Sequence, residues 1–288
     1  MNTLLIAGFG DIAKRALPQL RSHFEVCALL RPERIAAADG FRDVRPVSGD
    51  LDQPLTLDAI TASISHVVHL APPPATGRSD PRTARLLTAL TARTSLPGRL
   101  VYVSTSGVYG DCRGDWVDEQ RPPNPMSDRA RRRVDAERQI AAFADAHGIR
   151  LVILRVPGIY AADRLPTERL RKSTPVLHAD EDVYTNHIHA DDLARIVVAA
   201  LTHPAADGIF NACDDSALKM GDWFDLVADR AGLPRPPRIS RAEALQQIPQ
   251  PLLSFMSESR RLVNARMKRA LGIELDYPTV YAGVPVLR

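Results

Sequence analysis

The segment IAGFGDIAKR, residues 6–15, has the residue types and spacing of a loop that binds phosphate groups. Gly8, Gly10 and Ala13 follow a short apolar run and precede a helical pattern. In such a loop the first glycine makes a tight turn, the second lets the backbone approach a pyrophosphate, and the third position stays small for helix packing. The N–H groups at the helix start then hold the phosphate. The pattern predicts a dinucleotide-binding loop, and a tight turn without a ligand is the alternative. The loop residues expected to contact the cofactor are Gly8, Phe9, Gly10, Asp11 and Ile12.

Three further strand ends carry residues that suit the same cofactor. Arg31 ends the second apolar run, where an acidic residue would bind the ribose 2′-hydroxyl of NAD. Because arginine accommodates a 2′-phosphate instead, the sequence favours NADP(H) over NAD(H). A solvated strand end is the alternative for Arg31. The other expected cofactor contacts are Asp50 and Leu51 at the third strand end and Leu70, Ala71 and Pro72 at the fourth.

The segment SDRARRRVDAERQ, residues 127–139, contains five arginines, and four of them crowd positions 129, 131, 132 and 133. Arginine stays protonated because its pKa lies above about 12, so it acts as a fixed cation and not as a proton carrier. Arg129 and Arg133 lie one helical turn apart and face the same side, so both are expected to look into one cleft. Arg131 and Arg132 are expected to face solvent. A charged helix surface is the alternative, and no interleaved aromatic residues support a nucleic-acid site.

Alternating strands and helices are predicted to position these residues. Strands alternating with helices at this spacing predict βαβ units, and hence a Rossmann-type, doubly wound parallel sheet of the α/β class. The predicted strands are 3–8, 24–31, 44–51, 66–72, 99–106 and 150–160, and the predicted helices are 11–23, 58–64, 81–94 and 127–147.

The second half of the chain is less regular. Residues 183–201 predict a strand, a turn and a helix capped by Asp191, and residues 208–215 predict a further strand. We expect residues 1–160 to form the dinucleotide-binding domain, with 183–213 returning to it, and residues 161–288 to form mostly a smaller substrate lobe. Within that lobe, 233–240 is predicted to be a proline-broken linker and 257–273 a basic helix.

The bulk composition is that of a globular protein with a balanced charge. The 288 residues are 45% hydrophobic and 25% charged, and 37 basic against 34 acidic side chains give a net charge of +3. No apolar run is long enough for a membrane span or a signal peptide. Cys27, Cys112 and Cys213 are scattered, which fits a reducing cytoplasm. We therefore expect a cytoplasmic monomer or homodimer that binds a small-molecule substrate, and neither nucleic acid nor membrane.

Several motifs in order along the chain resemble the short-chain dehydrogenase/reductase superfamily, in its extended or atypical NAD-dependent epimerase/dehydratase branch. The glycine loop is followed by Asp50-Leu51, HLAP, VSTSGVYG, LRVPGIY and NHIHADDLA. The resemblance covers most of the chain, and VSTSGVYG before an acidic, proline-rich loop is its most specific part. It implies a cofactor across the strand ends and a substrate pocket between two lobes.

The resemblance also implies roles for individual residues. Thr105, four residues before Tyr109, takes the place of the serine or threonine that hydrogen-bonds the reacting substrate oxygen. Tyr109 is implied as a pocket-wall residue and a candidate substitute acid. The segment VPGIY matches the part of the family whose backbone holds the nicotinamide, through Pro157, Gly158 and Ile159.

The family's catalytic Tyr-x-x-x-Lys pair is missing from this chain. Counting back from Glu137, which matches a glutamate usual on that helix, puts the tyrosine position at Arg129 and the lysine position at Arg133. Residues 122–140 contain no tyrosine and no lysine. Arg133 remains able to hydrogen-bond the nicotinamide ribose, and Arg129 to stabilise an oxyanion or bind a carboxylate or phosphate.

Other constellations carry weaker signals. His187, His189 and Asp191 have a spacing that suggests a metal, but the segment matches a structural element of the family, so we expect no metal. Tyr160 and Tyr184 are alternative acids.

Two functions fit these features. The first is an NAD(P)-dependent oxidoreductase, epimerase or dehydratase acting on a small carbonyl or sugar-like substrate with a non-standard acid/base set. The second is a non-catalytic NADP(H)-binding protein that reports redox state to a partner.

Overall fold

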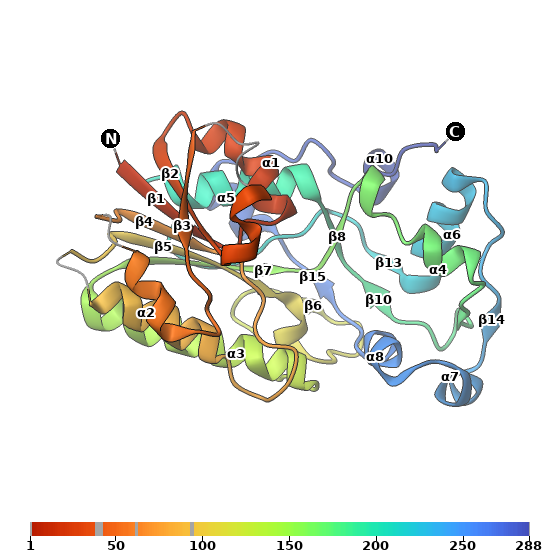
Figure 1. Cartoon of the computed structure of the whole chain (residues 1–288). Coiled ribbons are helices and arrows are strands. Elements are labelled where there is room, and N and C mark those ends of the chain that lie inside the picture. Colours follow the sequence, from red (N-terminus) through yellow and green to blue (C-terminus); the bar gives the residue numbers. More distant parts are fainter. Residues whose placement is uncertain (1, 38–42, 61–62, 93–94, 288) are drawn as a thin grey trace.

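A seven-stranded parallel sheet forms the centre of the protein in a computed structural model that describes residues 2–37, 43–60, 63–92 and 95–287 (Figure 1). The strand order is β12-β7-β5-β4-β1-β2-β3, so the chain starts in the middle and winds outward in both directions. This order confirms the predicted doubly wound α/β fold. The strands are β1 (Asn2–Ala7), β2 (Phe24–Leu30), β3 (Val44–Ser48), β4 (His66–His69), β5 (Arg99–Thr105), β7 (Arg150–Val156) and β12 (Gly208–Asn211).

Helices cover both faces of the sheet because each presents one apolar stripe. Helices α1 (Asp11–Leu20) and α5 (Ala190–Thr202) bury one stripe each on the upper face in Figure 1. Helices α2 (Pro81–Thr91) and α3 (Asp128–His147) cover the lower face. The central strands are buried on both faces, which explains why they read as continuous apolar runs and not as alternating patterns.

The predicted strand 150–160 is two strands. Pro157 lacks an N–H group for the sheet, and the chain leaves the sheet there. The second piece, β8 (Gly158–Tyr160), pairs instead with β11 (His187–His189) in a separate two-stranded sheet. This departure carries the chain from the main sheet into the smaller lobe (Figure 1).

The smaller lobe has its own apolar core. Two short strand pairs hold segments of this lobe together. β9 (Val176–Leu177) pairs with β14 (Arg238–Ile239), and β10 (Tyr184–Thr185) pairs with β13 (Leu218–Lys219). Its helices are α4 (Thr167–Arg171), α6 (Met220–Ala231), α7 (Arg241–Gln247), α8 (Gln250–Leu253) and α10 (Val280–Gly283).

Two local predictions around the main sheet are wrong. The region predicted as helix 58–64 instead holds a 3₁₀ turn, η2 (Pro54–Ala59), and residues 61–62 lie outside the described part. Asp191 does not cap α5; His189 is the N-cap, its Nδ1 accepts from the Asp191 N–H, and Asp191 lies in the first turn.

The tail prediction is wrong over its first half, and the linker prediction in part. Residues 258–264 are not helical; they include β15 (Arg261–Leu262), which pairs with β6 (Trp116–Val117). The helix α9 covers only Ala265–Leu271 and packs back onto α5 and β12. The predicted linker 233–240 contains β14. Sheet pairing with distant strands overrides the local pattern at both places.

No helix in the described part of the chain is long and apolar enough to cross a bilayer.

Candidate functional site

A cavity of about 570 Å³ opens at the carboxyl ends of the central strands. This is the edge where the strand order reverses between β1 and β4, and open α/β sheets bind ligands there. We call it the strand-end cavity. The predicted site residues that line it are Gly8, Phe9, Gly10, Asp11, Ile12, Arg31, Asp50, Leu51, Leu70, Ala71, Pro72, Thr105, Arg133, Pro157 and Ile159. Gly158, Tyr109 and Arg129 are not among its lining residues.

The glycine loop, residues 8–12, is shaped for a ligand that comes close to the backbone. Gly8 has φ +101°, and a Cβ added there would lie 2.4 Å from the backbone nitrogen of Ala71. Gly10 is the N-cap of α1 and provides no side-chain cap, and a Cβ there would meet nothing within 4 Å. The first N–H groups of α1 therefore lack a capping side chain and lie beside open space, which suits a phosphate.

Three arginines line the cavity on its β2 and α2 side. Arg31 follows β2 and pairs only loosely with Glu33, at 3.4 Å. Arg34 and Arg82 also line the cavity, and neither was predicted from the sequence. Arg82 is held by Asp52, with a Nη2–Oδ2 distance of 2.5 Å. The sequence signal that could have found Arg34 is its place three residues after Arg31 in LLRPER.

Thr105 ends β5 and points a hydroxyl at the same cavity. Its Oγ1 accepts a hydrogen bond of 3.2 Å from the Gly107 N–H, which caps the 3₁₀ turn η3 (Ser106–Tyr109). The hydroxyl proton is therefore still available to a ligand. The neighbouring Ser104 also lines the cavity, and its hydroxyl donates to buried Glu137 at 2.5 Å.

Arg133 reaches the cavity from α3, and two hydrogen bonds to β5 hold its side chain in place. Its Nη1 donates to the Tyr102 hydroxyl and to the Val103 carbonyl, both at 3.0 Å. Burial raises the pKa of Tyr102 to about 12, so this phenol remains neutral and serves as an acceptor for Arg133. Tyr102 was not predicted, because its role depends on a contact across 31 residues of sequence.

The other arginines of α3 differ from expectation. Arg132 was expected to face solvent, but it is 7% exposed, and its Nη1 donates to the Gly77 carbonyl at 2.6 Å. The expectation was wrong because residues 129, 132 and 133 share one helix face at spacings of three and four. Arg129 stacks over the Phe255 ring of the smaller lobe, 4.0 Å from its centroid. Arg131 pairs with Asp128 at 2.7 Å.

Tyr109 lies in a buried network behind the cavity. Its hydroxyl donates to Asn211 Oδ1 at 2.8 Å, and the Arg155 guanidinium lies 4.7 Å from its ring centroid. Burial raises the pKa of Tyr109 to about 12. Arg155 also forms a buried ion pair of 2.8 Å with Glu137. This environment suits a residue that supports the cavity wall and does not exchange protons near neutral pH.

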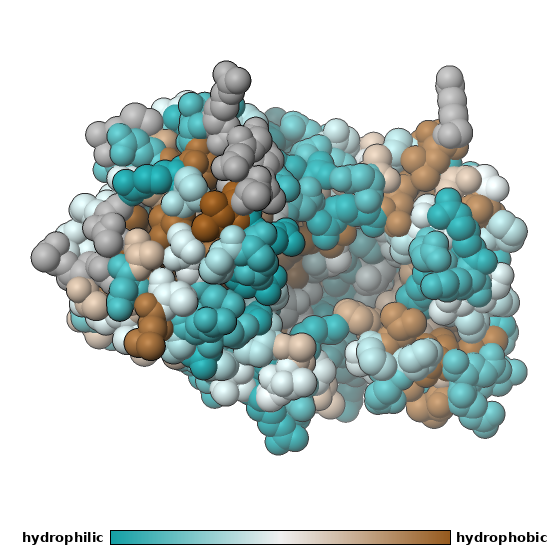
Figure 2. Space-filling view, viewed as in Figure 1, coloured by the Kyte–Doolittle hydropathy of each residue, from teal (hydrophilic) through white to brown (hydrophobic). Residues whose placement is uncertain are grey.

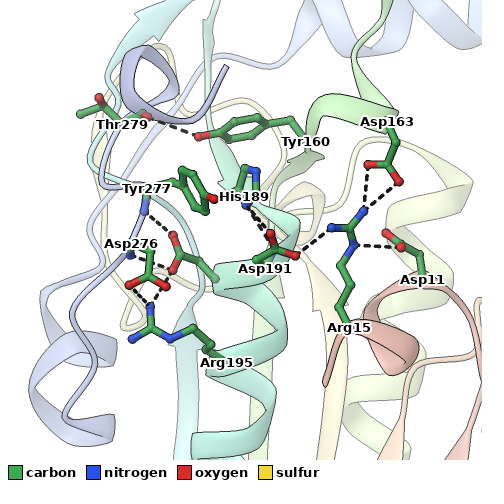
Figure 3. A network of polar contacts seen from close by, with 11 residues as sticks. Asp11, Arg15, Tyr160, Asp163, His189, Asp191, Arg195, Asp276, Tyr277 and Thr279 are labelled. Carbon is green, nitrogen blue, oxygen red and sulfur yellow. Dashed lines mark hydrogen bonds and ion pairs between the residues drawn. The ribbon is translucent and has the colours of Figure 1, made fainter. Parts of the chain in front are cut away.

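A network of charges ties the glycine-loop helix to the entry of the smaller lobe (Figure 3). Arg15 of α1 donates to Asp11 at 2.9 Å, to Asp163 at 2.8 Å and to Asp191 at 2.7 Å. Asp163 belongs to the 3₁₀ turn η4 (Ala162–Arg164), which we call the η4 strap. Arg164, which lines the cavity, donates to Asp11 at 2.8 Å.

The histidines considered as metal ligands pack against aromatic rings. His189 stacks on Tyr277 with centroids 3.7 Å apart, and His187 lies 4.3 Å from the Trp223 ring (ring centroids). Burial lowers the pKa of His187 to about 3, so it stays neutral. Within residues 2–37, 43–60, 63–92 and 95–287, no three His, Cys, Asp or Glu side chains gather as a metal site.

The fold and cavity are those of the Rossmann type, and a family comparison narrows the class. The NAD dependent epimerase/dehydratase family matches residues 6–213, which is most of the chain. The chain therefore belongs to the NAD dependent epimerase/dehydratase family, whose members bind NAD(P), as the motifs predicted.

Individual relatives are more distant. The chain is 24% identical over 181 residues to Protein YeeZ of Escherichia coli strain K12, a match over 62% of this chain and 59% of that protein. The match thus spans less than two thirds of the relative's length.

Solved structures agree over nearly the whole chain. A conserved protein of unknown function from Silicibacter pomeroyi has a TM-score of 0.80 and 27% identity, over 98% of this chain and 96% of that one. A UDP-glucose 4-epimerase of Thermus thermophilus in complex with NAD has a TM-score of 0.74 and 21% identity, over 99% and 97%. The second likeness shows the fold alone.

Proposed function

We propose that this protein binds a nicotinamide dinucleotide in the strand-end cavity and uses it to oxidise or reduce a small carbonyl or sugar-like substrate. The observation that carries the proposal is the convergence of the glycine loop, Thr105 and Arg133 on one cavity of about 570 Å³. A cavity of this size is within the range of small-molecule and cofactor sites. The NAD complex of the Thermus thermophilus epimerase, which shares this fold, supports the choice of ligand.

The proposed cofactor preference is NADP(H) over NAD(H). Arg31 and Arg34 line the cavity beside β2, where the ribose 2′ position lies in proteins of this fold. Arg31 has one loose ion pair, at 3.4 Å, and its guanidinium remains free to bind a phosphate. An NAD-binding site would place a carboxylate at this strand end.

The residues around the cavity have separate tasks in the proposed reaction. When bound, the nicotinamide ring supplies or accepts hydride. Arg133, anchored by Tyr102 and Val103, holds a ribose hydroxyl and fixes the orientation of the ligand. Thr105 donates its hydroxyl proton to the substrate oxygen as a hydrogen bond. Arg129 and Arg133 do not exchange protons near neutral pH. The proton that balances hydride transfer to the carbonyl carbon therefore passes from the Thr105 hydroxyl to the substrate oxygen, and water returns a proton to Thr105; oxidation runs the same steps in reverse.

The second candidate function is a dinucleotide-binding protein without turnover. The observation in its favour is that permanent cations occupy both positions of the family's Tyr-x-x-x-Lys pair. Such a protein would bind NADP(H) in the same cavity and would contact a partner in only one redox state.

Thr105→Ala tests the catalytic proposal. Purified protein is mixed with NADPH and a panel of small aldehydes, ketones and keto-sugars, and loss of NADPH absorbance is followed. We expect turnover with at least one compound, and a loss of kcat of about 100-fold in Thr105→Ala. The control Thr88→Ala removes an exposed threonine of α2 and should leave the rate unchanged. Tight NADPH binding without turnover would favour the second function.

A further inference from the structure

Three arginines of α3 share one helix face and lack an acidic partner. Arg129, Arg132 and Arg133 follow the i, i+3, i+4 spacing, and we call them the inward arginines. Arg133 donates to a phenol and a carbonyl, and Arg132 to the Gly77 carbonyl. Arg129 lies on the ring of Phe255 and makes no hydrogen bond or ion pair with any described residue. Each contact is therefore with a neutral group.

The acidic side chains near this face already form ion pairs with other arginines. Glu258 pairs with Arg260 at 2.9 Å, and Glu137 pairs with Arg155 at 2.8 Å. At the start of the helix, Asp128 pairs with Arg131 at 2.7 Å. The inward arginines thus leave an excess of positive charge on this face.

An uncompensated guanidinium is costly where it is desolvated, and within this cluster Arg132 is buried, Arg133 is half-buried and Arg129 is exposed. Arg132 is 7% exposed, and its Nε has no partner among the described residues. Partial burial lowers the pKa of Arg129, and the charges of Arg260, Arg132 and Arg133 act in the same direction, while the nearby charge of Glu258 opposes them. An anion bound among these groups would relieve both the repulsion and the desolvation.

The inward arginines extend from the strand-end cavity toward the smaller lobe. Arg133 lines the cavity, and Arg129 lies one turn earlier against Phe255, in the 3₁₀ turn η5 (Ser254–Ser257) that follows α8. Figure 2 shows the surface hollowed between the two lobes, and Figure 1 shows α8 beside one end of α3. A molecule in this hollow could therefore meet Arg129 while its reacting carbon lies near Thr105.

We infer that the substrate carries an oxyanion, a carboxylate or a phosphate, and that Arg129 binds it. The inference rests on the proposed function and names the class of substrate that the site takes. The Phe255 ring holds the guanidinium flat, and a planar fork suits bidentate contact with an oxyanion. Arg129 thereby takes part in substrate binding at the position where the family carries its catalytic tyrosine.

Titration with oxalate and with inorganic phosphate tests the inference. Each is titrated calorimetrically into the full chain, with and without saturating NADPH, against sodium chloride of equal ionic strength. We expect Arg129→Gln to raise the Kd of the preferred anion at least about 10-fold, which corresponds to about 1.4 kcal/mol. Arg129→Lys keeps the charge but loses the planar fork, and its Kd should lie between those of the wild type and Arg129→Gln.

Arg131→Gln is the matched control, since it removes one arginine from the same helix while sparing the inward face. Its Kd should stay within about twofold of the wild type. Equal losses in Arg129→Gln and Arg131→Gln, or no binding of either anion to the wild type, would overturn the inference. If oxalate has the lower Kd, the substrate carries a carboxylate; if inorganic phosphate has the lower Kd, the substrate carries a phosphate.

The NADPH affinity of the same proteins separates this inference from the proposed function. Arg129 does not line the strand-end cavity, so Arg129→Gln should bind NADPH as the wild type does. A wild-type chain that binds oxalate or phosphate through Arg129 but does not bind NADPH would contradict the proposed function alone.

Discussion

In the proposed function, Arg133 takes over part of the work that the family assigns to a lysine, by a different physical route. A lysine ammonium is a compact charge on a flexible stem, whereas a guanidinium is planar and can be anchored through one nitrogen while others stay free. Here Nη1 is spent on Tyr102 and Val103, which leaves the remaining donors for a ligand in the cavity. The position thus keeps its charge and gains rigidity, but it cannot follow a change in protonation of a neighbouring group.

Alanine substitutions at the two glycines of the loop, Gly8 and Gly10, separate an effect on folding from an effect on ligand binding. Gly8→Ala adds a Cβ that would lie 2.4 Å from a backbone nitrogen, at φ +101°. We expect a loss of about 3 kcal/mol or more in the free energy of unfolding, measured by urea denaturation.

Gly10→Ala tests the ligand and not the fold. A Cβ at Gly10 would meet no protein atom within 4 Å, and its φ of −101° is open to alanine. We expect wild-type stability but at least about 10-fold weaker NADPH binding by titration calorimetry, because the methyl group would occupy the approach of the pyrophosphate. Unchanged affinity in a folded Gly10→Ala variant would show that the ligand does not lie on this loop.

The η4 strap joins α1, the helix that follows the glycine loop, to the smaller lobe. Arg15 links α1 to Asp163 of the strap and to Asp191 of α5, so three elements meet at one guanidinium (Figure 3). Burial alone would raise the pKa of Asp11, but hydrogen bonds from Arg164 and Arg15 hold it below its ordinary value. Asp11 therefore stays ionised beside the proposed pyrophosphate site, and the two arginines compensate its negative charge.

Removing the strap's cation should expose that carboxylate to the ligand. We expect Arg164→Ala to weaken NADPH binding by about 10-fold, because Asp11 would lose one of its two partners next to an anionic pyrophosphate. Fluorescence titration of NADPH measures the effect. The control Arg171→Ala removes an exposed arginine of α4 and should bind NADPH normally. Equal affinity of both variants would mean that Arg164 has no part in the site.

At the same scale, the sequence predicted most of the main sheet and missed the elements held by distant partners. The apolar runs of the six predicted strands are confirmed. Five of them give a strong local signal because they are largely buried on both faces, whereas the edge strand β3 is partly exposed. The break at Pro157 was missed because β8 gains its partner, β11, about 30 residues later. Likewise β15 lies in a segment with a helical pattern, and its pairing with β6 decides its structure.

At the scale of the whole molecule, a buried acid just after β12 should make stability depend on pH. Asp214 is 3% exposed, its Oδ1 accepts from the Ser216 N–H at 2.9 Å, and its Oδ2 has no partner among the described residues. Burial raises the pKa of Asp214 to about 7, from 3.8. The folded protein therefore binds a proton that the unfolded chain has released between these two values, and stability falls as pH rises through this window.

Asp214→Asn removes the ionisable group and should abolish this loss. We expect the variant to be more stable than the wild type at pH 8, by about 1–3 kcal/mol, and to differ little from it at pH 4. Thermal unfolding at both pH values is the measurement, and Asp180→Asn, at an exposed position, is the control. A stability difference that is the same at pH 4 and pH 8 would show that Asp214 does not titrate in this range.

The candidate site was predictable to the extent that its residues follow strand ends. The glycine loop, Arg31, Asp50 and Thr105 were expected at the cavity because the carboxyl ends of parallel strands share one edge, and they line it. Arg164 was missed because its partner Asp11 is distant in the sequence. Tyr102 was missed because it acts through Arg133 of α3. The contact of Arg129 with Phe255 depends on how the smaller lobe returns, which no local pattern encodes.

Thermal unfolding in the presence of NADPH, NADP, NADH and NAD, one at a time, tests the central claim most directly. A ligand that binds only the folded state raises the midpoint in proportion to the logarithm of its concentration over Kd. The geometry of the strand-end cavity predicts that every stabilising ligand raises the midpoint of Gly10→Ala less than that of the wild type, and that NADPH and NADP stabilise the wild type more than NADH and NAD. No stabilisation by any of the four would contradict dinucleotide binding, and a larger effect of NADH would contradict the role assigned to Arg31.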